Sequence, residues 1–166
     1  MRLTLAGIFI VTISTLNYNC LFSQGLNELD KRNGFQSIKL GTKVDSYYFI
    51  KCDVGLSGIC RVDANDFAFK INGKKVEDID VSVKNGYIVS ILVFVRDPEF
   101  GFENFLINTY GPPTIKGEKS YCKWIGKRVS LTMESYEGIG SNRGIELMYS
   151  LYNASTNFDK LPSSDF

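Results

Sequence analysis

Residues Asp66 to Val95 read DFAFKINGKKVEDIDVSVKNGYIVSILVFV and carry the clearest pattern in the chain. Apolar side chains alternate with polar ones through most of this stretch, which is typical of strands that bury one face. Two Asn-Gly pairs, Asn72-Gly73 and Asn85-Gly86, interrupt the alternation. Asn-Gly favours the tight hairpin turn in which both central residues take positive φ. Residues of about 66–95 are therefore predicted to form a three-stranded antiparallel meander.

The last strand of this meander, from Tyr87 to Val95, is apolar on both faces. Such a strand is expected in the middle of a sheet, with both sides covered. The strand before it places Asp78 and Asp80 on one face and Ile79 on the other. Catalytic carboxylate pairs normally come from different elements across a cleft, so this pair is interpreted as a solvated strand face.

A helix is predicted over residues of about 100–110, FGFENFLINTY. Phe102, Phe105, Leu106 and Tyr110 recur at helical spacing and would form one apolar face. The Gly-Pro-Pro that begins at Gly111 favours a helix end at this point.

A second antiparallel meander is predicted over residues of about 119–152, because Val129, Leu131 and Met133 alternate with polar residues. The fold class is therefore α+β. KINGKKV at 70–76 resembles KWIGKRV at 123–129, which suggests a duplicated helix-plus-three-strand unit with halves of about 34–97 and 98–155. The alternative is that any two hairpins with glycine and lysine look alike.

The N-terminal residues 1–23 have the layout of a secretory signal peptide. Arg2 precedes the apolar run from Leu3 to Ile13, and Ser23 lies near the expected cleavage site. The run is too short to span a bilayer, so no transmembrane helix is predicted. The expected product is a single domain at 24–166, periplasmic or secreted, with a frayed tail at 157–166. Lipidation at Cys20 is the alternative, although Tyr18 and Asn19 are not the small residues that this signal requires.

Charge and composition exclude several function classes. Lys and Arg number 19 against 18 Asp and Glu, so nothing indicates a nucleic acid as partner. The chain has no histidine, which excludes Ser-His-Asp and Cys-His catalysis and histidine-ligated zinc. We expect no enzyme activity, no cofactor and no metal. The calcium-like start at Asp63 lacks the glycine and glutamate of an EF-hand loop.

Three cysteines follow the signal peptide. Cys52 and Cys60 enclose a short segment with two glycines, and an oxidising compartment favours a disulfide between them. The alternative is a pair of buried free thiols. Cys122 would then be unpaired, and it is expected to be buried and inert on the same strand face as Trp124.

Several short motifs of this chain resemble those of a group of known proteins. They are G-F-x-x-I-x-L-G-T from Gly34 to Thr42, the helix end Y-G-P-P from Tyr110, and a strand with Trp124. In these motifs the chain resembles a loose group of small secreted α+β proteins of Gram-negative bacteria, which have no assigned activity. Its layout is also similar to that of β-lactamase inhibitory proteins and small outer-membrane-assembly lipoproteins, an analogy of fold alone.

The sequence thus predicts a non-enzymatic module that binds another protein, of which an inhibitor or immunity-type protein is one form. Trp124, Tyr121 and Tyr87 are the candidate interface residues, since aromatic side chains often anchor interfaces. One alternative is an envelope-associated structural or assembly factor, lipid-anchored through Cys20. Another is a small-ligand or sugar binder that uses Trp124 and nearby tyrosines for stacking.

Overall fold

The computed structural model of the chain describes residues 25, 27–52, 58–62, 69–96, 101–118, 120–137 and 143–152. The predicted signal peptide at 1–23, the lipidation alternative at Cys20 and the tail at 157–166 lie outside these residues. Within the described part, no helix is both long enough and apolar enough to span a membrane.

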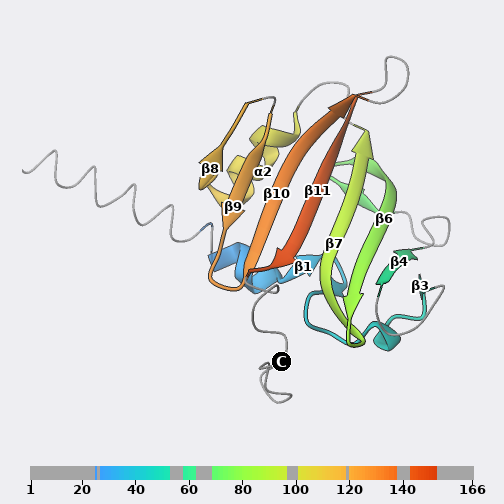
Figure 1. The fold of residues 1–166 in the computed structure, drawn as a ribbon. Helices are drawn as coiled ribbons and strands as arrows, with labels where there is room; N and C mark the ends of the chain where they lie inside the picture. Colours follow the sequence, from blue (N-terminus) through green and yellow to red (C-terminus); the bar gives the residue numbers. More distant parts are fainter. Residues whose placement is uncertain are drawn as a thin grey trace, which may run out of the picture.

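Most of the described residues belong to one antiparallel sheet of nine strands (Figure 1). From edge to edge, its main path is β3 (Ile50–Lys51), β4 (Gly58–Val62), β6 (Lys74–Lys84), β7 (Tyr87–Arg96), β11 (Arg143–Leu151), β10 (Val129–Glu137), β9 (Cys122–Ile125) and β8 (Ile115–Lys116). β5 (Lys70–Ile71) also pairs with β6, beyond the end of β4.

The first predicted meander is confirmed by β5, β6 and β7. Both Asn-Gly turns have the expected positive φ, at 49° and 75° for Asn72 and Gly73 and at 54° and 81° for Asn85 and Gly86. The prediction that β7 is a central strand is also confirmed, since it pairs with β6 on one side and β11 on the other. Its outward side chains Leu92 and Phe94 are nevertheless only half-buried.

The second predicted meander corresponds to β9, β10 and β11, and it is joined to the first in the same sheet. β7 pairs with β11 from Ser90 opposite Ser150 to Arg96 opposite Gly144. Read from either edge, the sheet has two outer strands followed by a long hairpin. This order is the one that a duplicated unit would give, and the duplication itself stays a prediction.

Two helices cover one face of the sheet. One contains residues 27–32, and the other is α2 (Phe102–Tyr110), which the sequence predicted. The N–H of Gly111 donates to the carbonyl of Ile107 and ends α2 at a φ of 76°. Helix and strand side chains form one core, in which Leu29, Phe102, Leu106, Ile79, Ile91, Leu131 and Leu147 have no exposed surface. Each such side chain contributes about 1.5–3 kcal/mol by burial.

The segment before the sheet contains several short elements. β1 (Gly34–Phe35) and β2 (Ile38–Lys39) form a separate two-stranded hairpin. The segment 44–51, which suits either a helix or a strand by sequence, contains both: η1 (Val44–Ser46) is a 3-10 helix and β3 follows.

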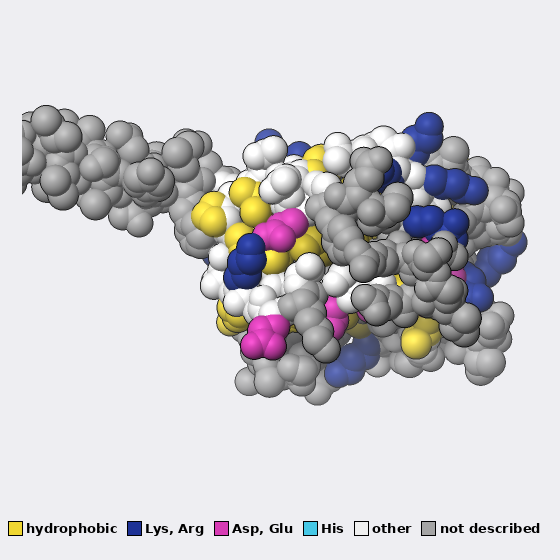
Figure 2. Space-filling view, turned by 90° about the horizontal axis from the view of Figure 1, so that it is seen from above, with side chains coloured by type: hydrophobic (Ala, Val, Ile, Leu, Met, Phe, Trp, Pro, Cys, Tyr) yellow, Lys and Arg dark blue, Asp and Glu magenta, His cyan; other side chains and the backbone are white. Residues whose placement is uncertain are grey.

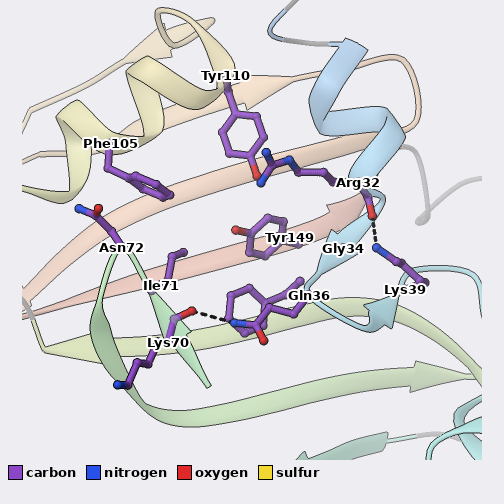
Figure 3. A pocket seen from close by; sticks show the side chains of 11 residues that line it. Arg32, Gly34, Gln36, Lys39, Lys70, Ile71, Asn72, Phe105, Tyr110 and Tyr149 are labelled. Atoms are coloured by element: carbon purple, nitrogen blue, oxygen red, sulfur yellow. Dashed lines mark hydrogen bonds between the residues drawn. The ribbon is translucent and has the colours of Figure 1, made fainter. Parts of the chain in front are cut away.

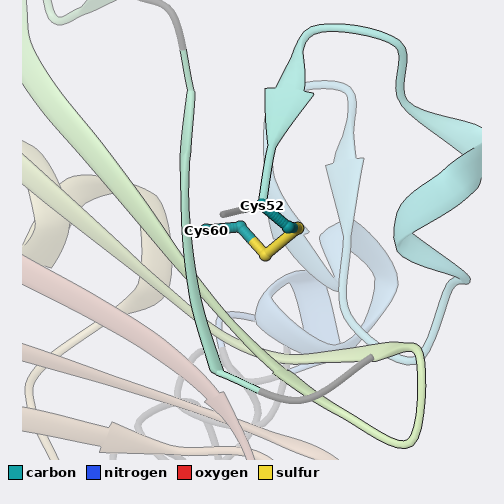
Figure 4. The surroundings of a disulfide bond; sticks show 2 residues. All are labelled: Cys52 and Cys60. Carbon is teal, nitrogen blue, oxygen red and sulfur yellow. A yellow bond between two sulfur atoms is a disulfide. The ribbon is translucent and has the colours of Figure 1, made fainter. Parts of the chain in front are cut away.

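The predicted disulfide is present. Cys52 and Cys60 are joined across β3 and β4, with their Cα atoms 4.3 Å apart (Figure 4). In the chain-entropy description, a loop of this size contributes about 2.5 kcal/mol to stability. Cys122 is a buried free cysteine, as predicted. Burial and the nearby carboxylate of Glu103 raise the pKa of its thiol, which disfavours the reactive thiolate.

Asp30 ties the N-terminal helix to the turn between β9 and β10. Its carboxylate accepts hydrogen bonds from the backbone N–H groups of Lys127 at 2.7 Å, Arg128 at 2.9 Å and Val129 at 3.0 Å. Gly126 makes the approach possible, because a Cβ at this position would lie 2.5 Å from Asp30 Oδ1. One carboxylate thus satisfies three consecutive backbone donors in a turn remote in sequence.

We expect Asp30→Ala to lower the free energy of unfolding by about 2–3 kcal/mol, the range for losing hydrogen bonds to a charged group. Gly126→Ala should also destabilise, since its methyl group would displace the same carboxylate. Gly101→Ala is the matched control, because a Cβ there meets no atom within 4 Å. Urea unfolding measures all three variants, and wild-type stability in both Asp30→Ala and Gly126→Ala would contradict this role.

Candidate functional site

The face of the sheet away from the helices, here called the open face, carries a continuous row of neighbouring side chains. Asp80, Leu92, Met148 and Thr132 lie opposite one another on β6, β7, β11 and β10. Arg61 on β4 extends the row beyond Asp80, and Lys123 on β9 extends it beyond Thr132. In Figure 1, α2 lies behind the sheet and this face is turned toward the reader.

Apolar side chains lie on the open face. We call Ile59, Leu92, Phe94 and Met148 the apolar strip. Ile59 is 72% exposed and Met148 is 39% exposed. Phe94 makes an edge-to-face contact with Tyr136, with ring centroids 6.3 Å apart. The apolar positions that suggested a doubly covered strand in the sequence therefore belong partly to the surface.

Charged groups surround the apolar strip. Arg61 lies 3.4 Å from Asp80 and 3.7 Å from Asp78, and Arg96 contacts Glu77 at 2.8 Å. These contacts support the interpretation of the aspartates as a strand face in contact with solvent and cations. In the described part of the chain, no group of three or more residues is suited to hold a metal ion.

Glu134 and Glu146 lie directly opposite each other on β10 and β11. Partial burial, and then the charge of Glu134, raise the pKa of the Glu146 carboxyl above its ordinary value. Among the described residues, neither carboxylate has a lysine or arginine within salt-bridge distance. Like charges at opposite positions destabilise a strand pair, so this acidic pair is held together by the rest of the fold.

Basic side chains gather elsewhere. Figure 2 shows Lys and Arg side chains clustered at the right, on the side of the molecule that holds β6. The hairpin of β5 and β6 supplies the exposed Lys70 and Lys75 and the half-buried Lys74. These lysines lie near the helix-covered side, where the structure also has a pocket.

The pocket has a volume of about 330 Å³ and lies between the two helices and two hairpins (Figure 3). Four separate segments line it, and their described residues are Arg32, Gly34, Phe35, Gln36, Lys39, Lys70, Ile71, Asn72, Phe105, Tyr110 and Tyr149. None of these described lining residues is acidic.

Two tyrosines form the buried part of the pocket. Tyr149 from β11 is 2% exposed, and Tyr110 from the end of α2 is 3% exposed. Burial raises the pKa of Tyr149 well above its ordinary value, with a further contribution from Tyr110. Burial also raises the pKa of Tyr110, while Arg32 opposes that shift. Both hydroxyls therefore stay protonated at physiological pH and can donate hydrogen bonds.

Arg32 stands at the rim of the pocket beside Tyr110. Its Nε donates to Glu28 at 3.0 Å, and its guanidinium carbon lies 5.7 Å from the centroid of the Tyr110 ring. Two further contacts close the rim: Gln36 Nε2 donates to the carbonyl of Lys70 at 2.8 Å, and Lys39 Nζ donates to the carbonyl of Arg32 at 2.7 Å.

The predicted interface residues are not brought together. Trp124 has no exposed surface, and its Nε1 donates to the carbonyl of Gly111 at 2.8 Å, so its ring belongs to the core. Tyr121 and Tyr87 are half-buried. β7, which holds Tyr87, is separated from β9 by β11 and β10. Trp124 therefore has no exposed ring on which a ligand could stack.

Sequence reasoning missed both surfaces. The sequence indicates an apolar helix position at Tyr110 and an alternating strand at Tyr149. Neither pattern predicts that these two side chains meet. Arg32 lies in a polar helix that has no motif. One feature of the sequence could have indicated the apolar strip: residues 87–95 are apolar on both faces of their strand.

Comparison with known proteins adds no family to this description. A scan against protein-family models found no match, and searches of curated proteins and of solved structures found none either.

Replacing Glu146 by Gln should stabilise the protein at neutral pH by about 0.2–1 kcal/mol, the usual cost of a like-charge pair. A raised folded-state pKa means that folding favours the protonated carboxyl, and wild type loses this contribution as pH rises through that pKa. The advantage of the variant should vanish below the unfolded pKa of about 4.3.

Urea unfolding at neutral pH and at low pH tests this expectation. Glu134→Gln should give a similar gain because it removes the same repulsion, whereas Glu118→Gln, at an exposed position after β8, should change nothing. A loss of stability in Glu146→Gln at neutral pH would show that the carboxylate has a favourable partner.

Proposed function

We propose that the protein is a non-enzymatic module, periplasmic or secreted, that binds another protein through the open face of its sheet. The observation that carries this proposal is the apolar strip, with Met148 and Ile59 exposed on a face that neither of the two helices covers. An antiparallel sheet can leave one face to water, but that face is then expected to be polar. Leu92, Phe94 and Met148 are neighbours on this face, with Ile59 two strands away, and apolar side chains gathered on an exposed face mark an interaction surface.

The arrangement of residues around the strip supports the same proposal. Specific interfaces combine an apolar centre with a polar, charged rim. On the open face the centre is Leu92 and Met148, and the row ends in Arg61 on one side and Lys123 on the other. The strands are fixed by the core beneath them, so the surface is formed before a partner arrives.

The acidic pair indicates what the partner presents. Glu134 and Glu146 repel each other in the free protein, and partial burial of Glu146 adds to the cost. A lysine or arginine of the partner placed between them would remove the repulsion and gain two charged contacts. The expected partner is therefore a protein surface with a basic residue beside apolar side chains.

The disulfide supports the proposed compartment. Disulfides persist in the periplasm and outside the cell, and are rare where thiols are kept reduced. The bond between Cys52 and Cys60 holds the β3–β4 edge of the sheet next to Ile59 on the open face. The absence of histidine from the chain favours binding over catalysis, because it removes the commonest general base.

The test is a comparative capture experiment with the mature chain from Gln24, immobilised and mixed with native cell-envelope extract. The wild-type protein should retain one partner that Met148→Glu loses, with binding weakened at least about thirtyfold, as for an interface hot spot. Tyr48→Ser is the matched control. It removes an aromatic side chain that is 86% exposed and lies in the loop before β3, away from the strip.

The charge of the partner is tested on the same captured protein. The double variant Glu134→Gln, Glu146→Gln should associate more slowly and lose most of the salt dependence of the association rate. The proposal is contradicted if Met148→Glu retains the partner as well as wild type does. It is also contradicted if sedimentation shows that the open face binds a second copy of this chain instead.

A further inference from the structure

The pocket on the helix-covered side offers a second, independent surface. It lies on the opposite side of the sheet from the apolar strip, because Tyr149 points to the helices whereas its neighbour Met148 points to the open face. Its volume of about 330 Å³ falls at the lower end of the range of small-molecule sites. A ligand in this pocket would be independent of the proposed protein-binding function.

The charges that line the pocket have one sign. Arg32, Lys39 and Lys70 contribute cationic side chains, and no Asp or Glu is among the described lining residues. Glu28 contacts Arg32 from the helix, where it accepts a hydrogen bond from Nε. This contact holds the guanidinium in place, and its terminal nitrogens lie beside the Tyr110 hydroxyl, with which Arg32 also interacts (Figure 3). A guanidinium has five N–H donors, so one that is held in this way can still bind a carboxylate or a phosphate.

The buried tyrosines add donors next to the guanidinium. Tyr110 and Tyr149 are almost fully buried, and their side chains interact with each other and with Arg32. The two hydroxyls share one hydrogen bond, and the proton that this bond does not use can be donated to an anion, strongly so in a site with little water. Figure 3 shows both rings in the middle of the pocket, between α2 and the β1–β2 hairpin.

The remaining walls are apolar. Phe35 from β1, Ile71 from β5 and Phe105 from α2 line the pocket, and Phe35 contacts the Tyr149 ring with centroids 6.0 Å apart. These side chains fit a hydrocarbon or aromatic body and would exclude water from it. Polar donors on one side and apolar walls on the other define an amphipathic ligand.

We propose that this pocket binds a small organic anion, with its carboxylate or phosphate held by Arg32 and the hydroxyls of Tyr110 and Tyr149. The apolar body of the ligand packs on Phe35, Ile71 and Phe105. Lys39 and Lys70 at the rim attract the anion and strengthen its binding without contacting the buried hydroxyls.

Titration calorimetry on the disulfide-intact mature chain tests this proposal with benzoate and phenyl phosphate as probes. At least one of them should bind at one site, and the stronger probe identifies the carboxylate or the phosphate as the preferred group. Benzamide is the neutral counterpart of benzoate and should bind much more weakly. Failure of both anions to bind at millimolar concentration overturns the proposal.

Two variants and one control test whether the anion binds in this pocket. Arg32→Gln should weaken the bound anion at least about tenfold, as expected for a lost charge-assisted hydrogen bond, and Tyr149→Phe should weaken it while keeping the ring. Lys31→Gln is the control, because Lys31 lies on the same helix, also approaches Glu28 at 3.9 Å, and does not line the pocket. Unchanged affinity in Arg32→Gln, or equal binding of benzamide, overturns the proposal.

Discussion

β7 pairs on one side with β6 and on the other with β11, and the second pairing holds the two long hairpins in one sheet. Its register also fixes which residues meet the helices. With Ile91 opposite Tyr149 and Leu92 opposite Met148, the odd-numbered positions from 91 to 95 and from 145 to 149 face the core, and the even-numbered positions between them face outward. A slip by one residue would exchange the two sets, so burial of the core specifies this register strongly.

Both candidate surfaces follow from that register. Tyr149 reaches the pocket between the helices, while Met148, the adjacent residue in the chain, lies in the apolar strip on the opposite face. The helices complete the pocket because contacts with the sheet hold them. Asp30 accepts hydrogen bonds from the β9–β10 turn, and the Gly111 carbonyl at the end of α2 accepts one from Trp124 Nε1. A rigid sheet with two different faces thus places a small cationic pocket behind an apolar surface.

Local features were predictable and long-range ones were not. Each feature that the structure confirms depends on a short stretch of sequence. These features are the Asn-Gly turns, the helix that ends at Tyr110 and the bond between Cys52 and Cys60. The pairing of β7 with β11 has no local signal, because alternation shows that a strand has a buried face but not which strand lies beside it. For the same reason, Trp124 could not be assigned to the core or to the surface. The pocket joins side chains from four segments of the sequence, and the carboxylate of Asp30 meets a turn almost a hundred residues away.

Native-state hydrogen exchange followed residue by residue tests the central pairing most directly. If β7 and β11 hold the two hairpins in one cooperative unit, their core amides should exchange most slowly and with one common opening free energy, because neither hairpin can open without the other. Denaturant added below the unfolding transition should leave that free energy equal for residues 90–96 and 144–150. Loss of protection in one hairpin, while the other keeps its own, would contradict the account and show two separately stable halves.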